Sequence, residues 1–229
     1  LEAKIDRIQG EIDMKIGEAR VRLQEGQWDQ ACSILQELAD ASKARPEISA
    51  LGGRARLRSF YLHLAAGIQR FEVAMCKAFA DRVGDLAAAV DSLETASRRA
   101  PDHGLGRQWL DLCRRHLNAT RLCVEAEGHL VKEEYDKGLE MFEAALGEVT
   151  AFAPALDGRL RALAGLARVA YGRSRRLDAG SAKESLLAAL ASYEECEGIA
   201  QRHKTLSGRN DRLYPDVPER IAALRDQIQ

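Results

Sequence analysis

Hydrophobic residues recur every three or four positions along most of the chain, which is the spacing that lines one face of an α-helix. The first such run consists of Ile5, Ile8, Ile12, Ile16, Ala19 and Leu23. It predicts a helix that ends at about Gln24. The break at Glu25-Gly26-Gln27 is followed by a second run from Trp28 to about Ala44, where Arg45-Pro46 prevents continuation. These two segments form a predicted helical hairpin.

Three further hairpins are predicted in the same rhythm. Their helices run from after Gly52-Gly53 to about Val83, from Leu86 to before Pro101, from Leu105 to Leu130, from Leu139 to Val149, from Leu160 to Ala170, and from Ser181 to about His203. Ser181 is a predicted N-cap, because Glu184 follows it at the spacing of a capping box. The expected organisation is a helical repeat domain at 1–204, a Gly- and Pro-containing linker at 205–218, and a C-terminal helix at 219–229 that caps the stack.

Composition supports an all-α fold. The chain has 229 residues, of which 46% are hydrophobic and 30% charged, with only five prolines. This excludes general disorder and favours helix-forming residues throughout. No uncharged apolar run reaches the length of about 18 residues that a membrane span needs. Five widely spread cysteines without a Cys-x-x-Cys pair indicate reduced thiols, so we expect a cytoplasmic location and no membrane. Because residue 1 already lies inside a helical pattern, we expect the chain to be part of a larger protein.

One turn motif recurs between the paired helices. Gly26-Gln27-Trp28-Asp29-Gln30-Ala31 has the order glycine, polar, aromatic, two polar residues and alanine. Related segments begin at Gly84 and Glu133, and a weaker copy surrounds Ala189. Glycine permits a tight turn, the aromatic residue fills the space between helices, and alanine lets their backbones approach. The recurrence indicates stacked hairpins.

In these turns the chain resembles the tetratricopeptide repeat (TPR) family. The resemblance implies an α-solenoid of about four antiparallel helical hairpins, and a role in binding other proteins. The period of about 50 residues differs from the roughly 34 of that family, and most of the aromatic and Leu-Gly positions of the family's first helix are missing. A general α-solenoid is the structural alternative, with the same class of function.

No motif for catalysis is present: the sequence has no phosphate-binding glycine loop after a strand, no Gly-x-Ser-x-Gly and no His-Glu-x-x-His. We therefore expect no enzymatic activity and no cofactor. Cys113, His116, Cys123 and Glu127 fall within one arc of a predicted helix. At a rise of about 1.5 Å per residue they spread over several turns, so packing is favoured over a metal site.

Basic residues form three ridges at seven-residue steps, which is nearly two helical turns. Their members are Arg56, His63, Arg70 and Lys77; Arg107, Arg114 and Arg121; and Arg161, Arg168 and Arg175. In TPR-like stacks the first helices line the concave surface, so the ridges are expected to form one basic groove. Gly165 and Gly172 leave backbone open along the last ridge, so another chain is expected to approach closely there. Leu57 and Tyr61 fall on the core stripe of their predicted helix. Phe60 stands beside that stripe and is the expected exposed hydrophobic anchor.

The predicted function is a protein-interaction scaffold or sensor module that docks an acidic or amphipathic segment of a partner on the first-helix face. Arginine suits carboxylates because its planar fork donates two hydrogen bonds. The ridges are alternatively solvated or paired with acidic second helices, through Asp91, Glu94, Glu140 or Glu143. A nucleic-acid-binding repeat is less favoured, since aromatic residues do not interleave the ridges. A small-ligand-sensing regulatory domain is the remaining alternative.

Overall fold

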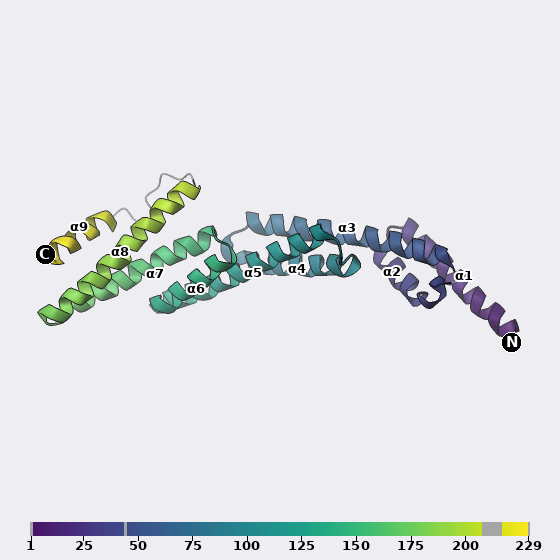
Figure 1. The fold of residues 1–229 in the computed structure, drawn as a ribbon, viewed down its shortest axis with the longest axis horizontal. Coiled ribbons are helices and arrows are strands. Elements are labelled where there is room, and N and C mark those ends of the chain that lie inside the picture. Colours follow the sequence, from purple (N-terminus) through teal and green to yellow (C-terminus); the bar gives the residue numbers. More distant parts are fainter. Residues whose placement is uncertain (1, 44, 208–216, 229) are drawn as a thin grey trace. The chain divides into compact units, whose positions relative to one another are not determined.

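The computed structural model describes residues 2–43, 45–207 and 217–228, and all regular structure in these ranges is helical (Figure 1). The elements are α1 (Glu2–Gln24), α2 (Trp28–Glu37), η1 (Asp40–Lys43), α3 (Pro46–Cys76), η2 (Phe79–Asp81), α4 (Arg82–Arg99), α5 (Gly104–Val131), α6 (Tyr135–Glu148), α7 (Ala153–Ser174), α8 (Ala179–Ser207) and α9 (Val217–Ile228). The predicted all-α class is confirmed, and consecutive helices pack against one another.

The chain divides into two compact units. The first unit comprises residues 1–77 and 84–114, and the second comprises 78–83 and 115–229. In the first unit, α1, α2 and the start of α3 enclose a core that contains Ile16, Leu35 and Ile48. In the second unit, α7, α8 and α9 enclose one that contains Leu163 and Tyr193. Each unit therefore has its own buried apolar centre.

Helix α3 differs from its predicted bounds at both ends. It begins at Pro46, so the Gly52-Gly53 pair lies inside the helix and not before it. Proline is favoured in the first helical turn because its fixed φ suits the helix and its missing N–H has no partner to lose. Ile48 and Ala55 are buried on either side of the glycines and hold this segment against α2. The helix ends at Cys76, about seven residues before the predicted end.

The start of α8 also differs from prediction. The cap is Asp178, whose carboxylate accepts a hydrogen bond from the Ser181 backbone N–H at 3.0 Å. Ser181 itself lies inside the helix, so its assignment as the N-cap was wrong. Helix α8 extends to Ser207 and α9 begins at Val217. Of the predicted linker at 205–218, residues 208–216 lie outside the described residues.

Two of the predicted turns adopt the same geometry, one in each unit. Gly26 and Glu133 have φ values of 75° and 60°, and within the described ranges these are the residues with positive φ. Beyond each, a backbone N–H returns to a carbonyl five residues earlier: Gln27 to Arg22 at 2.8 Å, and Glu134 to His129 at 3.0 Å. This is the helix-ending pattern of a Schellman motif.

The correspondence extends beyond the turns. From position 26 to position 133 the offset is 107, and the same offset relates the ends of α1 and α5, the starts of α2 and α6, and the starts of α3 and α7. The other two motif copies do not form turns, because Gly84 lies in the first turn of α4 and Ala189 is buried within α8. The two units therefore share a common framework of three helices.

Candidate functional site

A groove opens on the α1, α2 and α3 framework of the first unit. We call it groove 1; it has a volume of about 720 Å³ and is lined by Arg20, Leu23, Gln24, Trp28, Leu51, Arg54, Leu57, Arg58 and Tyr61. Leu57 and Tyr61 stand one turn apart on α3 and are each 49% exposed. Of its described lining residues, three are arginines and none is acidic. The groove thus combines apolar surface with positive charge.

The second unit has a groove at corresponding positions. Groove 2 has a volume of about 440 Å³ and is lined by Glu127, Leu130, Val131, Tyr135, Arg161, Ala164, Arg168, Tyr193, Val217 and Arg220. Seven of these residues match groove 1 at the offset of 107: Arg20 and Glu127, Leu23 and Leu130, Gln24 and Val131, Trp28 and Tyr135, Arg54 and Arg161, Leu57 and Ala164, Tyr61 and Arg168. The shared framework therefore builds the same groove twice.

The two grooves differ at the arginine that they share. In groove 2, Arg161 donates to both carboxylate oxygens of Glu127, one of them at 2.8 Å, and to Asp157 at 3.0 Å. In the first unit the equivalents of Glu127 and Asp157 are Arg20 and Ala50.

Arg54, the equivalent of Arg161, therefore has neither of these two carboxylates beside it. Arg54 is exposed and forms no hydrogen bond or ion pair with the described residues. Arg20 is itself paired with Glu47 at 2.9 Å, between side chains that are about half exposed. Arg58 is exposed too, and no residue of the described ranges pairs with it. The positive charge of Arg161 is therefore neutralised within groove 2, whereas that of the equivalent Arg54 remains available in groove 1.

The aromatic residues after the two turns have different neighbours on the third helix. In the second unit the Tyr135 ring lies against Gly165, where a Cβ atom would overlap it. The equivalent position in the first unit is Arg58, so Trp28 cannot lie flat on α3 in the same way. The close approach at Gly165 is made within the molecule, and the expectation that another chain uses it was wrong. Gly172 has open space around it.

Helix α9 forms part of the wall of groove 2. Val217, Ile221 and Leu224 are buried against α7 and α8, and Arg220 lies over the Tyr193 ring at 5.9 Å from its centroid. Arg225 pairs with Glu194 of α8 at 2.7 Å. The C-terminal helix therefore covers apolar surface of the second unit.

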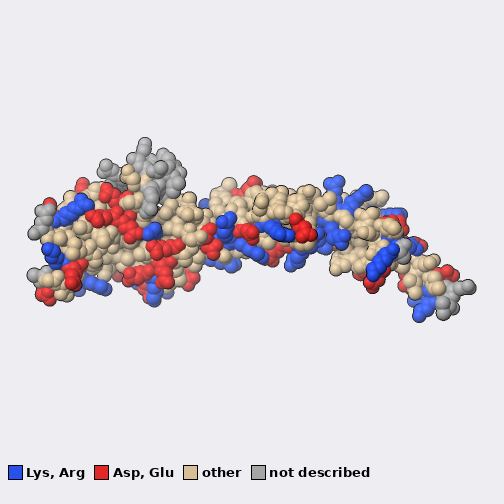
Figure 2. Space-filling model, viewed as in Figure 1, with Lys and Arg blue, Asp and Glu red and all other residues tan. Residues whose placement is uncertain are grey.

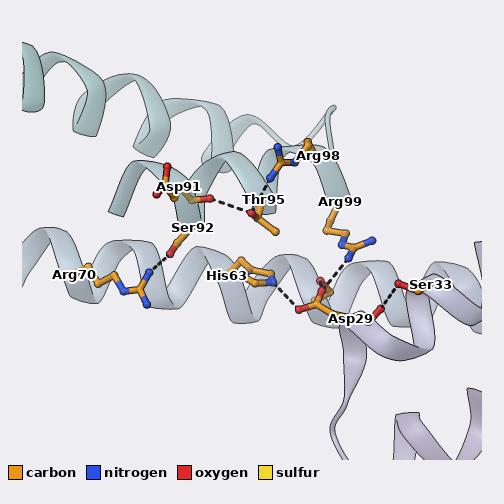
Figure 3. Close-up of polar contacts among 10 residues, drawn as sticks. Asp29, Ser33, His63, Arg70, Asp91, Ser92, Thr95, Arg98 and Arg99 are labelled. Atoms are coloured by element: carbon orange, nitrogen blue, oxygen red, sulfur yellow. Dashed lines mark hydrogen bonds and ion pairs between the residues drawn. The ribbon is translucent and has the colours of Figure 1, made fainter. Parts of the chain in front are cut away.

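The predicted ridge on α3 does not face groove 1. His63 lies 2.8 Å from the Asp29 carboxylate of α2, and Arg70 donates to the Ser92 hydroxyl of α4 at 2.5 Å (Figure 3). Lys77 pairs with Asp85 of α4. Arg56 is exposed and lines a different pocket, together with Arg98 and Arg99. Residues at this seven-residue spacing therefore lie mainly on the side of α3 that packs against α2 and α4.

The other ridges divide between internal pairs and exposed positions. Arg114 pairs with Glu94 at 2.8 Å, as the pairing alternative predicted, and Arg107 donates to the Pro101 carbonyl. Arg175 lies over the Tyr171 ring. Arg121 is exposed and has no ion pair within the described part of the chain. Arg161 and Arg168 are thus the two predicted site residues that line a groove of the shared framework.

Phe60 is not an exposed anchor. Its exposed fraction is 0%, its ring centroid lies 4.3 Å from that of His103, and its Cε2 atom approaches Gly106. A Cβ on Gly106 would lie 3.0 Å from that ring atom, so the glycine of α5 makes room for Phe60. The exposed aromatic residue is its neighbour Tyr61, which the hydrophobic pattern assigned to the core.

Asp29 joins three helices of the first unit. Its carboxylate accepts hydrogen bonds from His63 at 2.8 Å and Arg99 at 3.1 Å (Figure 3), and from Ser59 at 2.6 Å. Burial favours the neutral acid, but the hydrogen bonds from Ser59 and His63 and the nearby positive charges outweigh it, so the pKa of Asp29 is lowered. Ser59 and His63 both bind the carboxylate and not each other, so they form a clamp and not a proton relay.

The cysteines of α5 are buried thiols. Burial raises the pKa of Cys113 to about 11 and that of Cys123 to about 12, which keeps both protonated at neutral pH. His116 lies edge-on to the Phe152 ring. Among the residues described, no group of three or more His, Cys, Asp or Glu side chains is placed to hold a metal ion.

Charge on the surface is mixed. On the face drawn in Figure 2, acidic side chains gather over α6, while both signs of charge appear elsewhere. No helix in the described ranges is apolar over the length needed to cross a bilayer. No protein-family model matches the sequence, and no curated protein matches it.

Proposed function

We propose that the chain is a protein-interaction module that binds an acidic amphipathic helix of a partner protein in groove 1. The observation that carries the proposal is the pair of arginines Arg54 and Arg58, which lack internal partners among the described residues and flank exposed Leu57 and Tyr61. In groove 2 the corresponding arginine is already neutralised by Glu127 and Asp157. Groove 1 therefore offers the stronger site for an external carboxylate.

The order of residues on α3 favours a helical ligand. Arg54 and Arg58 are one turn apart, and so are Leu57 and Tyr61, which gives a charged row beside an apolar row. A helix with glutamates four residues apart and leucines in an adjacent row matches both rows. Helix-in-groove recognition works through such anchors at i, i+3, i+4 and i+7.

A TPR-like α-solenoid is the architecture that we infer for this module. Support comes from the repeated corner at Gly26 and Glu133, from the repeated three-helix framework, and from the consecutive packing of helices. In such a stack the first-helix surface is available to a partner. The binding surface is then made by α1 and α3, with Trp28 of α2 at its edge.

The test uses a synthetic helical peptide that carries one leucine row and one glutamate row, labelled for fluorescence anisotropy. We expect it to bind the wild-type protein, and the double variant Arg54→Glu, Arg58→Glu to weaken binding at least tenfold. A peptide with lysine in place of glutamate keeps the apolar row and should bind at least tenfold more weakly. Binding should also weaken as salt is raised, because the groove arginines are exposed.

The matched control is the double variant Arg115→Glu, Arg121→Glu, which changes the net charge equally on exposed positions of α5. It should leave peptide affinity within about twofold, a change of less than about 0.5 kcal/mol. Equal loss of binding in both double variants, or equal binding of the glutamate and lysine peptides, would overturn the assignment of groove 1. Circular dichroism of each variant verifies that the helices are retained.

A further inference from the structure

A second pocket of the first unit lies between α2, α3 and α4, away from groove 1. It has a volume of about 470 Å³. Its lining comprises Cys32, Leu35, Gln36, Ala39, Ser42, Ile48, Ser49, Gly52, Arg56, Arg98 and Arg99. Its apolar floor belongs to the core of the first unit, since Cys32, Leu35 and Ile48 are buried there. We call it the basic pocket.

Three arginines from two helices line the basic pocket. Among its described lining residues there is no aspartate or glutamate to neutralise them. Arg56 is exposed and forms no hydrogen bond or ion pair inside the described ranges. Arg98 donates to the Thr95 hydroxyl at 3.0 Å, and no carboxylate of the described residues pairs with it. The pocket therefore holds positive charge in excess.

Arg99 is held in place by a carboxylate that does not line the pocket. It donates to Asp29 at 3.1 Å (Figure 3), and the same carboxylate is held by His63 and Ser59. A guanidinium that is already oriented loses less side-chain entropy when it binds an anion. Burial raises the pKa of the Cys32 thiol and the Asp29 carboxylate adds to this effect, whereas the positive charges of Arg99 and Arg56 both lower it. Both guanidinium charges therefore act on buried Cys32 in the floor of the pocket.

The remaining polar groups add hydrogen-bond donors. The Gln36 side-chain amide and the exposed Ser49 hydroxyl also belong to the pocket lining. A tetrahedral dianion has three terminal oxygens and can accept from several guanidinium forks and hydroxyls at once, whereas a single carboxylate has two oxygens. This set of donors matches a phosphoryl group better than a carboxylate.

We propose that the basic pocket binds a phosphoryl group, carried either by a small phosphate ester or by a phosphorylated side chain of a peptide. The site is independent of groove 1, because α3 presents Ser49, Gly52 and Arg56 to the basic pocket and a different set of residues to the groove. Arg56 and Arg98 supply the unpaired charge, and Arg99 supplies the pre-oriented donor.

The experiment is isothermal titration calorimetry with four probes: inorganic phosphate, O-phosphoserine, a pentapeptide with a central phosphoserine, and the same peptide with glutamate. We expect phosphoserine to bind and the double variant Arg56→Gln, Arg98→Gln to weaken it at least tenfold. The control Arg54→Gln, Arg58→Gln removes the same charge from groove 1 and should change the affinity less than twofold. Arg99 is kept, because it also holds Asp29.

Each outcome has a defined consequence. If phosphoserine and its pentapeptide bind equally, the ligand is a small ester; if the pentapeptide binds at least tenfold more tightly, the ligand is a phosphorylated side chain. Equal affinity for the glutamate and phosphoserine peptides would overturn the assignment to a phosphoryl group. Equal loss of affinity in the two double variants, or no phosphate or phosphoserine binding at millimolar concentration, would overturn the site. The peptide test of groove 1 is unaffected by any of these results.

Discussion

In the second unit Arg161 is held between Glu127 and Asp157, whereas in the first unit the equivalent Arg54 stands near Arg20 and Ala50. The helices around the two arginines begin and end at matching positions. The same arrangement of helices can therefore contain a paired arginine in one unit and an exposed arginine without an ion pair among the described residues in the other. The comparison shows that the charge presented in such a groove depends on two or three side chains and not on its backbone.

Gly165 provides the strongest test of this difference. We expect Gly165→Ala to reduce the free energy of unfolding of the second unit by about 3 kcal/mol, because the new Cβ would overlap the Tyr135 ring. Arg58→Ala, at the equivalent position of the first unit, should change it by less than about 0.5 kcal/mol. Urea denaturation followed by circular dichroism measures both. Equal effects would show that the two aromatic corners pack alike.

Asp29 and Asp136 form a second matched pair at the same offset. Asp29→Ala should cost about 2 kcal/mol, because the buried Ser59 hydroxyl loses its acceptor and His63 and Arg99 lose theirs. Asp136 is exposed, and Asp136→Ala should cost less than about 0.5 kcal/mol. Thermal unfolding of the two variants compares them directly. A large cost at Asp136 would contradict the assignment of a clamp to the first unit alone.

The lowered pKa of Asp29 adds a pH dependence to that comparison. Because the folded-state pKa lies below the ordinary value of 3.8, the ionised carboxylate stabilises the folded state at pH values above that ordinary value. This contribution is lost as pH falls through the lowered folded-state pKa. The stability difference between wild type and Asp29→Asn should therefore shrink as the pH falls below 3.8. A difference that grows below this pH would contradict this direction.

The smallest expected effect on stability comes from converting groove 1 toward groove 2. Arg20→Glu places a carboxylate at the position of Glu127, where it can pair with Arg54. We expect a stability change of only about 0.5 kcal/mol, since the new pair and the Arg20–Glu47 pair that it replaces are both exposed. Affinity for the glutamate-row peptide should nevertheless fall at least tenfold in anisotropy measurements. Unchanged affinity would show that Arg54 does not contact the ligand.

The sequence predicted the helices and the corners better than the face of α3. Two hydrophobic stripes on α3 have helical spacing, and both include Leu64. Leu57 and Tyr61 precede Leu64 in one stripe, and Phe60 precedes it in the other. Spacing alone cannot choose between them. The choice is made by Gly106, which lies 46 positions beyond Phe60 and leaves room for its ring. The groove residues Leu57 and Tyr61 were therefore assigned to the core.

The arginines also show that spacing along the sequence does not determine which face of a helix is open to a partner. Seven-residue spacing correctly placed Arg161 and Arg168 on one face of α7, and both line groove 2. On α3 the same spacing selected His63 and Arg70, which bind Asp29 and Ser92. Arg54 and Arg58 lie on another side and have no heptad partner. A signal was present in the offset of 107 between the two corners, which aligns Arg54 with Arg161.

The position of Trp28 makes occupancy of groove 1 observable without a label. The indole lines the groove, while Trp109, the other tryptophan of the chain, packs edge-on against the Phe71 ring at 5.9 Å. A ligand that displaces water from groove 1 changes the polarity around Trp28 and leaves Trp109 unaltered. Intrinsic emission can therefore report binding at this site, with the Trp28→Phe variant providing the spectroscopic background.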